Sequence, residues 1–381
     1  MTHNNLYANY CFQRQKENLF RALPSYPKRR LIDFSSNDFL NLSRNPQLIN
    51  AAFKYAKKYG VGATGSRLLS GNKRCFSSLE KQIAKDKKTQ NALLFNSGYQ
   101  ANSTVLSSLL DQKILKNQAL VFFDKANHSS LYHGIFLSQS QLIRYHHLNM
   151  QDLEKKLQKH EKDQRPKFIV SETLFSMDGD MADIATLIKL AKKYSALLYL
   201  DEAYTTGIFG ENGYGLSTLH DFQDVPHVIM GTLSKAIGAS GAFVACNNDT
   251  HSYLINNCNG FIYSTAPSPM IIGAIHAAWK LLPKLNKQRE KILEHANNLK
   301  TELRNMHFDI GSSTSHIIPI ILKDEKKVID TQNYLKTKGL LLSAIRPPTV
   351  PVNTARLRIA ITSSHTQNDT DKLLKALKKI C

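Results

Sequence analysis

Short apolar runs rich in β-branched residues alternate with longer segments of helical periodicity between residues 46 and 270. Such runs, bounded by polar or turn residues, are typical of buried strands. Their alternation with helices predicts an α/β fold with a mostly parallel central sheet covered on both faces, in which ligands lie beyond the carboxyl ends of the strands. We predict strands at 91–95, 120–124, 142–147, 167–172, 196–202, 227–234 and 241–246, and helices that include 152–160 and 183–193.

The pattern changes after about residue 270. A long helical stretch at 269–307 precedes an apolar strand at 317–322, a helix at 326–338, two further apolar strands and a final amphipathic helix at 367–380. This order predicts a smaller C-terminal α+β domain. We therefore expect an N-terminal segment (1–45) packed near the small domain, a large ligand-binding domain (46–270), and a linking helix with the small domain (271–381).

Composition narrows the class of protein. No stretch approaches the roughly 18 apolar residues of a membrane helix, and the first thirty residues lack a signal-peptide pattern, so we expect a cytoplasmic protein. The five cysteines are scattered and have no CxxC spacing, which argues against a disulfide framework and against a bound metal.

The net charge is unusual, with 50 basic against 30 acidic residues. A formal charge of +20 can steer nucleic acid, an anionic membrane or an anionic substrate. No block of five like charges occurs, and no nucleic-acid recognition motif accompanies the charge, so nucleic acid is not an expected partner. Two interpretations remain: a solvated lysine-rich surface, and a basic mouth that attracts an anionic acyl thioester.

An acid and a lysine follow two of the predicted strands. Asp201 ends the strand in ALLYLDEAY, and Lys235 follows the strand that ends in GTLSK. Pyridoxal phosphate (PLP) enzymes need this pair: the lysine forms a Schiff base, and the carboxylate keeps the pyridine nitrogen protonated. Alone, Asp201 could cap a helix and Lys235 could lie on the surface. Gly238 and Gly241 favour the site, because glycine allows the backbone to approach a ligand closely.

Eight segments in order resemble the α-oxoamine synthases, fold-type-I (aspartate aminotransferase-like) PLP enzymes that condense an amino acid with an acyl-CoA. The segments are FSSNDFLNLS, GATGSRLLSGN, FNSGYQAN, DKANHSSL, ETLFSMDGD, DEAYTTGIFGENGYG, GTLSKAIGASGAF and YSTAPSP. The resemblance covers nearly the whole chain. It implies decarboxylation of the amino acid and release of CoA.

The tail AIRPPTVPVNTARLRIAIT (344–362) is similar to the branch that makes 8-amino-7-oxononanoate, a biotin precursor, from L-alanine and a pimeloyl thioester. The acyl donor could be pimeloyl-CoA or pimeloyl-acyl carrier protein. Other branches remain alternatives: glycine C-acetyltransferase, 5-aminolevulinate synthase or a sphingolipid-type synthase. A weakened PLP-fold protein that only binds or regulates is a further alternative.

The resemblance implies a role for each matching residue of the cofactor site. His128 stacks on the PLP ring against Ala203, and Ser176 bonds near the phenolate side of the cofactor. Gly98 and Tyr99 begin a helix whose free N–H groups suit a phosphate. The remaining cofactor residues are Asp201, Tyr204, Thr232 and Lys235, with Ser264 and Thr265 supplied by the neighbouring subunit of a homodimer with shared active sites.

The same resemblance implies the substrate contacts. Arg358 grips the amino-acid carboxylate, since a planar guanidinium can bind it bidentately. Asn37 assists, and Thr349 and Arg21 contact substrate. Surface pairing or turn capping is the alternative for these residues. The catalytic group is Lys235 as general base, with Asp201 and His128.

The chain departs from the family at four positions. Tyr204 replaces a histidine that donates to the PLP 3′-oxygen; a phenol is also a donor, so we expect altered tuning of the cofactor. Phe76 replaces a frequent histidine, Ser234 a glycine, and Asn353 a glycine whose left-handed backbone asparagine tolerates. These departures bear on catalytic efficiency and not on cofactor binding.

Overall fold

The protein is described by a computed structural model that covers residues 3–23 and 31–380. It divides into two compact units. The small unit comprises Met1–Asn37, Ser176–Asp180 and Glu290–Cys381, and the large unit comprises Asp38–Phe175 and Met181–Arg289. The short excursion at 176–180 belongs to the small unit, where the Gly179 carbonyl accepts from Thr314 N at 3.0 Å and Ser312 donates to Asp180 at 2.6 Å.

The large unit is built on a sheet that has seven strands within the described residues. Strand β8 runs antiparallel to both of its neighbours, and the remaining neighbouring pairs are parallel. The prediction of a mostly parallel sheet is therefore confirmed. The strand order is β2 (Asn91–Phe95), β8 (Ala242–Cys246), β7 (His227–Thr232), β6 (Ala196–Asp201), β5 (Lys167–Glu172), β3 (Leu120–Asp124) and β4 (Gln141–Tyr145).

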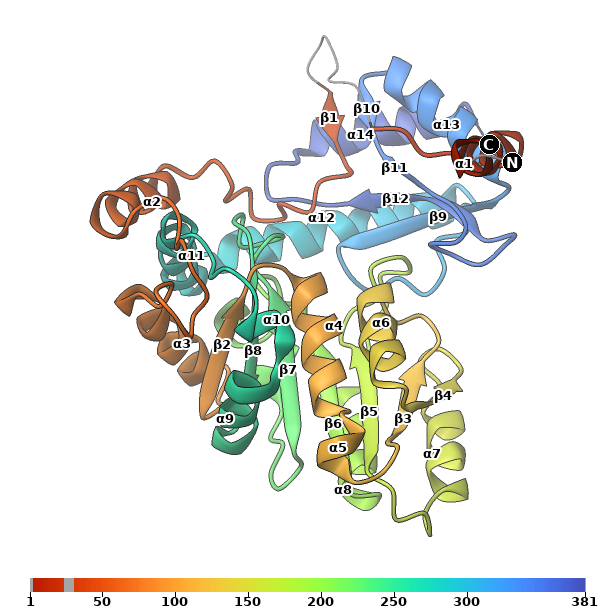
Figure 1. Cartoon of the computed structure of the whole chain (residues 1–381). Coiled ribbons are helices and arrows are strands. Elements are labelled where there is room, and N and C mark those ends of the chain that lie inside the picture. The colour runs from red at the N-terminus through yellow and green to blue at the C-terminus, as the bar shows by residue number, and fades with distance from the viewer. Residues whose placement is uncertain (1–2, 24–30, 381) are drawn as a thin grey trace. The chain divides into compact units, whose positions relative to one another are not determined.

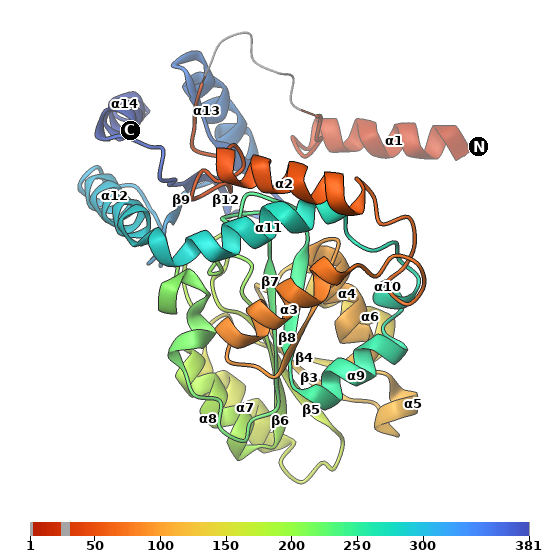
Figure 2. The same cartoon turned by 90° about the vertical axis from the view of Figure 1, so that its left-hand side faces the viewer.

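Helices cover both faces of this sheet. Figure 2 shows the sheet nearly edge-on, with α4 (Gly98–Leu109) and α6 (Ser129–Ser138) on one side and α7 (Met150–Lys159) and α8 (Ile184–Lys193) on the other. The buried positions of α8 follow helical spacing, which explains why its apolar stripe faces the sheet. The large unit also contains α2 (Pro46–Tyr59), α3 (Arg74–Asp86), α5 (Gln112–Leu115), α9 (Asn248–Asn257), α10 (Asn259–Ile262) and α11 (Pro269–Leu281).

The small unit holds an antiparallel sheet of order β11-β12-β9, three strands among the described residues. Strand β1 (Ile32–Asp33) pairs in parallel with β10 (Leu340–Leu341), which ties the N-terminal segment to this unit. The other elements are α1 (His3–Lys16), α12 (Asn286–Asn305), β9 (Ile317–Lys323), α13 (Glu325–Thr337), β11 (Ser343–Ile345), β12 (Ala355–Ala360) and α14 (Gln367–Leu377), labelled in Figure 1. The first four residues of α12 belong to the large unit, and the small unit takes up the helix from Glu290.

One prediction from the apolar pattern was wrong, and one helix was missed. The long helix at 269–307 is interrupted, because α11 ends at Leu281 and a 3₁₀ turn at Leu282–Lys284 precedes α12. Pro283 lies in that turn, and proline cannot donate the N–H that a continuous helix needs. Helix α1 was not predicted, since it buries no residue and therefore shows no apolar stripe. Throughout residues 3–23 and 31–380, every helix is too short or too polar to traverse a bilayer.

A buried ion pair lies next to the end of β6. Lys87 follows α3 and is 2% exposed, and its ammonium donates to the Glu202 carboxylate, to Tyr214 O at 2.8 Å and to Ser217 Oγ at 2.7 Å. Glu202 also accepts from Ser217 N at 2.6 Å. Burial lowers the pKa of Lys87, and the nearby Glu202 charge opposes that shift. The pair therefore holds the segment around residue 217 against the end of β6.

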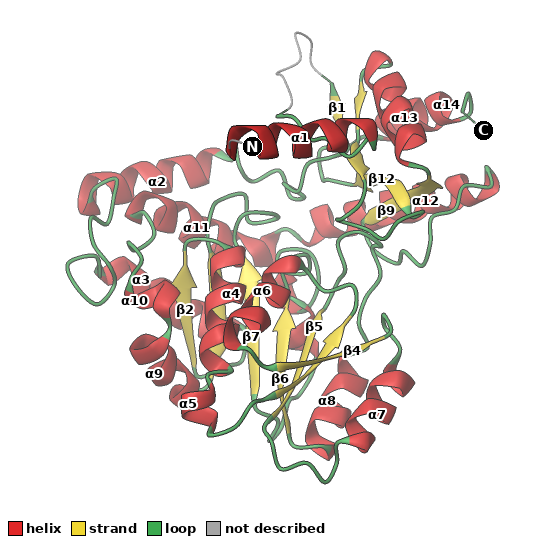
Figure 3. Ribbon diagram, turned by 45° about the vertical axis from the view of Figure 1, so that its right-hand side comes forward, coloured by secondary structure: helices red, strands yellow, loops and turns green. Residues whose placement is uncertain are grey.

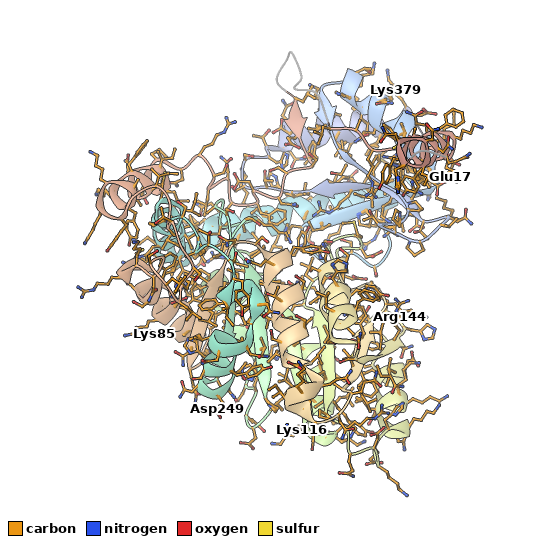
Figure 4. The ribbon with its side chains drawn as sticks, in the orientation of Figure 1. Glu17, Lys85, Lys116, Arg144, Asp249 and Lys379 are labelled. Atoms are coloured by element: carbon orange, nitrogen blue, oxygen red, sulfur yellow. The ribbon has the colours of Figure 1, made fainter. Side chains whose placement is uncertain are left out.

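Replacing Lys87 with Met should destabilise the protein by about 3–5 kcal/mol, because Glu202 would be left as a buried charge without its ammonium partner. The measurement is denaturant unfolding of the wild type and the variant. The double variant Lys87→Met/Glu202→Gln should recover a large part of the loss, since it removes both charges. Lys85→Met is the matched control, because Lys85 is an exposed lysine in the last turn of α3. Figure 4 labels Lys85. If Lys85→Met destabilised the protein as much as Lys87→Met does, this role for the ion pair would be contradicted.

Candidate active site

The carboxyl ends of four strands of the large unit meet at one edge of the sheet. Strands β3, β5, β6 and β7 are parallel neighbours, and the arrows of β5, β6 and β7 point the same way in Figure 3. Asp201 and Glu172 are Cα partners at the ends of β6 and β5. His128 follows β3, and Lys235 follows β7. The structure therefore brings Asp201, His128 and Lys235 to the predicted edge.

The Asp201 carboxylate is buried and held by two donors. Its Oδ2 accepts from Asn102 Nδ2 at 2.7 Å, and its Oδ1 accepts from Ala203 N at 2.8 Å. The side chain is 3% exposed. A buried carboxylate needs such donors to offset the loss of water. The bond from Ala203 is a local turn contact, whereas the bond from Asn102 comes from α4, and together they fix the direction in which the carboxylate points.

The amine of Lys235 lies over the face of the Tyr204 ring, with Nζ 3.3 Å from the ring centroid. An ammonium in this position is attracted by the negative face of the aromatic ring. Tyr204 is buried and its ring also contacts Phe39, at 6.2 Å between centroids. Tyr204, which replaces the family's histidine, therefore lies beside the lysine and is not a remote core residue.

His128 is the N-cap of α6, and its ring forms local hydrogen bonds. Its Nδ1 lies 2.7 Å from Ser130 Oγ and accepts from Ser130 N at 3.2 Å. Although the residue is exposed to solvent, the protein atoms packed around the imidazole lower its pKa. The positive charge of Lys235 acts in the same direction, and the Asp201 charge opposes it. The imidazole is therefore neutral near pH 7.

Glu172 was missed from the sequence. It is 4% exposed, and its Oε1 accepts from His128 N at 2.6 Å. Burial and the neighbouring Asp201 charge raise the pKa of Glu172 well above its usual range, while Lys235 opposes the shift. The residue thus ties β5 to the start of α6. Its place in the motif ETLFSMDGD, directly at a strand end, was the available signal.

The start of α4 forms a small polar cradle with the end of β7. A methyl group placed on Gly98 would lie 3.7 Å from Thr232 Oγ1, so the two residues are neighbours. Tyr99 is the next residue of the first turn, where backbone N–H groups have no partner within the helix. Ser264 Oγ accepts from Gln100 Nε2 at 3.0 Å, and Thr265 O accepts from Asn96 Nδ2 at 2.8 Å. Within one chain, Ser264 and Thr265 therefore lie beside the predicted phosphate residues.

The two glycines after Lys235 lie against the chain's own backbone. A side chain on Gly238 would collide with Ser43 N at 2.5 Å, and one on Gly241 would meet Phe95 O at 2.9 Å. The backbone φ angles of these glycines are +69° and +112°. Each glycine therefore allows neighbouring main chain to approach closely.

The predicted substrate residues lie in the small unit and contact one another in pairs. Arg358 on β12 is 4% exposed; its Nε donates to Ser176 O at 2.7 Å and its Nη2 donates to Asn37 Oδ1 at 3.0 Å. Arg21 donates to Thr349 Oγ1 at 2.8 Å. The bonds at Arg358 fix the plane of its guanidinium, as bidentate binding of a carboxylate requires.

Three of the departures from the family pattern have a structural account. Phe76 is fully buried on α3, with the Arg67 guanidinium 4.5 Å from its ring centroid, and Arg67 also pairs with Glu80 at 2.7 Å. Phe76 therefore packs. Asn353 adopts φ +62°, the left-handed conformation that the replaced glycine provides. Ser234 is exposed, and its Oγ lies 2.8 Å from Thr232 Oγ1.

The order of the strands, with a lysine and an acid at the carboxyl edge of the sheet, agrees with the aminotransferase class of PLP enzymes. The model for the aminotransferase class I and II family matches residues 29–377, and the chain belongs to this family. The fold predicted from the motifs is thus confirmed.

The relatives are more specific. A putative 8-amino-7-oxononanoate synthase of Magnetococcus marinus is 39% identical and aligns with 98% of this chain and 96% of its own. Among solved structures, SPT with a PLP internal aldimine is 25% identical with a TM-score of 0.91, covering 100% of this chain and 98% of its own. The 8-amino-7-oxononanoate synthase of Francisella tularensis is 28% identical with a TM-score of 0.79, covering 92% and 97%. These similarities confirm the resemblance to the α-oxoamine synthases.

The small unit contains a buried histidine that should make stability depend on pH. Burial, reinforced by the charges of Arg358 and Lys300, lowers the pKa of His316 to about 3. In the unfolded chain the ordinary value is about 6.5, so the unfolded state takes up this proton first as pH falls. The free energy of unfolding should therefore decrease as pH drops from about 6.5 toward 3, by up to about 1.4 kcal/mol per pH unit.

Replacing His316 with Gln removes this contribution. Chemical denaturation at a series of pH values should show a constant difference between variant and wild type above pH 7. Below about 6.5 the difference should move in favour of the variant. A difference that stays constant down to about pH 4 would contradict the assignment.

Proposed function

We propose that the protein condenses L-alanine with a pimeloyl thioester to give 8-amino-7-oxononanoate, with release of carbon dioxide and the free thiol. The observation that carries the proposal is the placement of Lys235 and Asp201 at one sheet edge, in a chain whose full-length relative is a putative 8-amino-7-oxononanoate synthase. The tail 344–362 supports the same branch. Pimeloyl-CoA and pimeloyl-acyl carrier protein both fit as donors.

Pyridoxal phosphate fits the residues of the large unit. Asp201 offers a buried carboxylate whose direction is fixed, which suits the pyridine nitrogen. The N-terminus of α4 beside Thr232 suits the phosphate, because its N–H groups and the helix dipole both favour an anion. His128 and Ala203 are assigned to the two faces of the ring. Lys235 is the residue that holds the cofactor covalently.

When bound, PLP supplies an electron sink for charge that develops at the amino-acid Cα. The protein's residues supply the rest of the chemistry. Lys235 removes the proton from Cα, since its amine lies at this sheet edge and a free lysine amine can act as a general base. Asp201 would hold the ring nitrogen of the bound cofactor through its carboxylate. Arg358 binds the alanine carboxylate, with Asn37 holding its guanidinium in plane, and Thr349 and Arg21 contact the acyl substrate.

We further propose that the active unit is a homodimer with shared sites. Ser264 and Thr265 are the residues assigned to the phosphate of the neighbouring subunit. Support comes from their position within one chain, beside Asn96 and Gln100 at the start of α4. A residue next to one phosphate cradle can reach a second one when two copies meet at that surface.

A second function is favoured by one observation. The SPT structure has the higher TM-score of the two solved structures compared, 0.91 against 0.79. An α-oxoamine synthase with another amino acid, such as serine or glycine, is therefore the alternative. The tail motif argues for alanine, and a screen of amino acids separates the two.

The proposed reaction is tested by incubating the purified protein with alanine and pimeloyl-CoA and detecting the aminoketone by mass spectrometry. Parallel reactions contain glycine or serine, and acetyl- or palmitoyl-CoA. Alanine with pimeloyl-CoA should react fastest. Lys235→Ala should lower turnover by at least about 100-fold, because the general base and the covalent anchor are both lost. Borohydride reduction of the wild type should attach the cofactor to Lys235. Attachment to another lysine, or faster turnover with glycine and acetyl-CoA, would refute the proposal.

Tyr204 gives a sharper test of cofactor tuning. We expect its hydroxyl to donate to the PLP 3′-oxygen and so to stabilise the anionic oxygen. Tyr204→Phe keeps the ring face that contacts Lys235 and removes only the hydroxyl. A lost hydrogen bond to a charged group is worth roughly 1.5–3 kcal/mol. The pH midpoint of the cofactor's absorption change should therefore rise by about one to two units.

Tyr204→His is the matched variant, because it restores a donor at the same position. Its midpoint should stay low, and it should remain active. A midpoint that is unchanged in Tyr204→Phe would show that Tyr204 only packs.

A further inference from the structure

Asn102 connects the acid and the stacking histidine of the candidate active site, although neither sequence nor similarity singled it out. It lies on α4 and is 2% exposed. Its Nδ2 donates to Asp201 Oδ2 at 2.7 Å and to Ser130 Oγ at 2.9 Å. Its Oδ1 accepts from Tyr199 OH at 2.9 Å. The amide therefore uses both of its N–H donors and its oxygen inside the protein.

The orientation of this amide follows from its partners. Oδ2 of the Asp201 carboxylate accepts, so the NH₂ group must face Asp201. On the other side, burial and the Asp201 charge raise the pKa of Tyr199 well above its usual value, so the phenol keeps its proton and donates it to Oδ1. With the amide reversed, two acceptors would face each other at Asp201.

The hydrogen-bond network extends from Asn102 through Ser130 to His128. Ser130 is 1% exposed, and its Oγ accepts from Asn102 and lies 2.7 Å from its other partner, His128 Nδ1. The backbone N–H of Ser130 is aimed at the same nitrogen, at 3.2 Å. Because this N–H donates to Nδ1, the nitrogen carries no hydrogen, and the Ser130 hydroxyl therefore also donates to it. In the neutral imidazole the proton is therefore on Nε2.

We propose that Asn102 and Ser130 are positioning residues that couple the Asp201 carboxylate to His128 and hold the imidazole as its Nε2–H tautomer. In this state His128 offers a hydrogen-bond donor to an oxygen of the substrate, either the amino-acid carboxylate or the thioester carbonyl. It does not act as a base through Nδ1, because that lone pair is occupied by Ser130. The role at the substrate rests on the proposed function; the tautomer does not.

The charged and titratable groups around His128 agree with a neutral ring. Lys235 lies after β7, and its positive charge disfavours a second proton on the imidazole. Asp201 on β6 has the opposite effect, but its Oδ2 and Oδ1 accept from Asn102 and Ala203. Glu172 on β5 bonds to the backbone of His128, and the Tyr99 ring on α4 meets the imidazole edge-on, at 6.4 Å between centroids.

The tautomer can be read by nitrogen NMR of the full-length protein as purified, with ¹⁵N-labelled histidine. The His128 signal is identified by its loss in a His128→Gln variant. In the wild type at neutral pH, Nδ1 should show the shift of an unprotonated ring nitrogen and Nε2 that of a protonated one. Ser130→Ala should give a mixture of tautomers, and Ser130→Thr, which keeps a hydroxyl, should restore the wild-type pattern.

Two further variants make the test specific. Asn102→Leu should also mix the tautomers, because the Ser130 oxygen loses the N–H that holds it beside His128 Nδ1; this variant reports on the network if Ser130→Ala does not fold. Ser103→Ala is the matched control, since its buried hydroxyl on the same helix donates to Tyr99 O at 2.7 Å. It should leave the His128 signals unchanged.

Kinetics supply the second measurement. Ser130→Ala should lower kcat by about 2- to 10-fold with little change in the KM for alanine, as expected for one hydrogen bond that acts in the transition state. If Ser130→Ala and Asn102→Leu both keep the Nε2–H tautomer, or if Ser103→Ala disturbs it equally, the proposal is overturned. A tautomer change in a protein that condenses no amino acid would support the network and refute the proposed function alone.

Discussion

The candidate active site depends on keeping a buried carboxylate at the end of β6. An ionised group removed from water is expensive unless donors replace the lost hydration, and here one donor comes from the next residues of the chain and one from α4. Asn102 can reach Asp201 only if α4 packs at a fixed distance from the end of β6. Gly134 makes that packing possible, because a side chain there would meet Leu106 Cβ at 2.7 Å. The close contact of α4 and α6 thus serves the position of one carboxylate.

The position of Lys235 also depends on close packing at glycines. The turn after Lys235 is pinned by main chain on both sides, at Ser43 and at Phe95, which is why Gly238 and Gly241 cannot carry side chains. The flexible lysine is therefore attached to a rigid turn. Its amine is directed by the Tyr204 ring, and Tyr204 belongs to the same strand end as Asp201. Acid, aromatic ring and amine are positioned by two adjacent strands.

Much of this arrangement could be predicted from the sequence. Buried parallel strands read as continuous apolar runs, so the ends of β3, β5 and β6 were predicted to within one residue, and the site residues follow them. Helix α1 could not be predicted, because without buried positions it has no periodic signal. The hydrogen bonds of Asn102 could not be predicted either. They join residues 97 to 99 positions apart at Asp201 and Tyr199, and no local pattern encodes such a pairing.

Polarity adds a constraint that residue types alone do not reveal. The donors of this network run in one direction: Tyr199 donates to Asn102, Asn102 donates to Ser130, and the N–H and hydroxyl of Ser130 donate to His128 Nδ1. The carboxylate of Asp201 sets the same direction from the other side of Asn102. An ionised aspartate at position 102 would have nearly the same volume but no N–H, so Asp201 and Ser130 would both lose a donor.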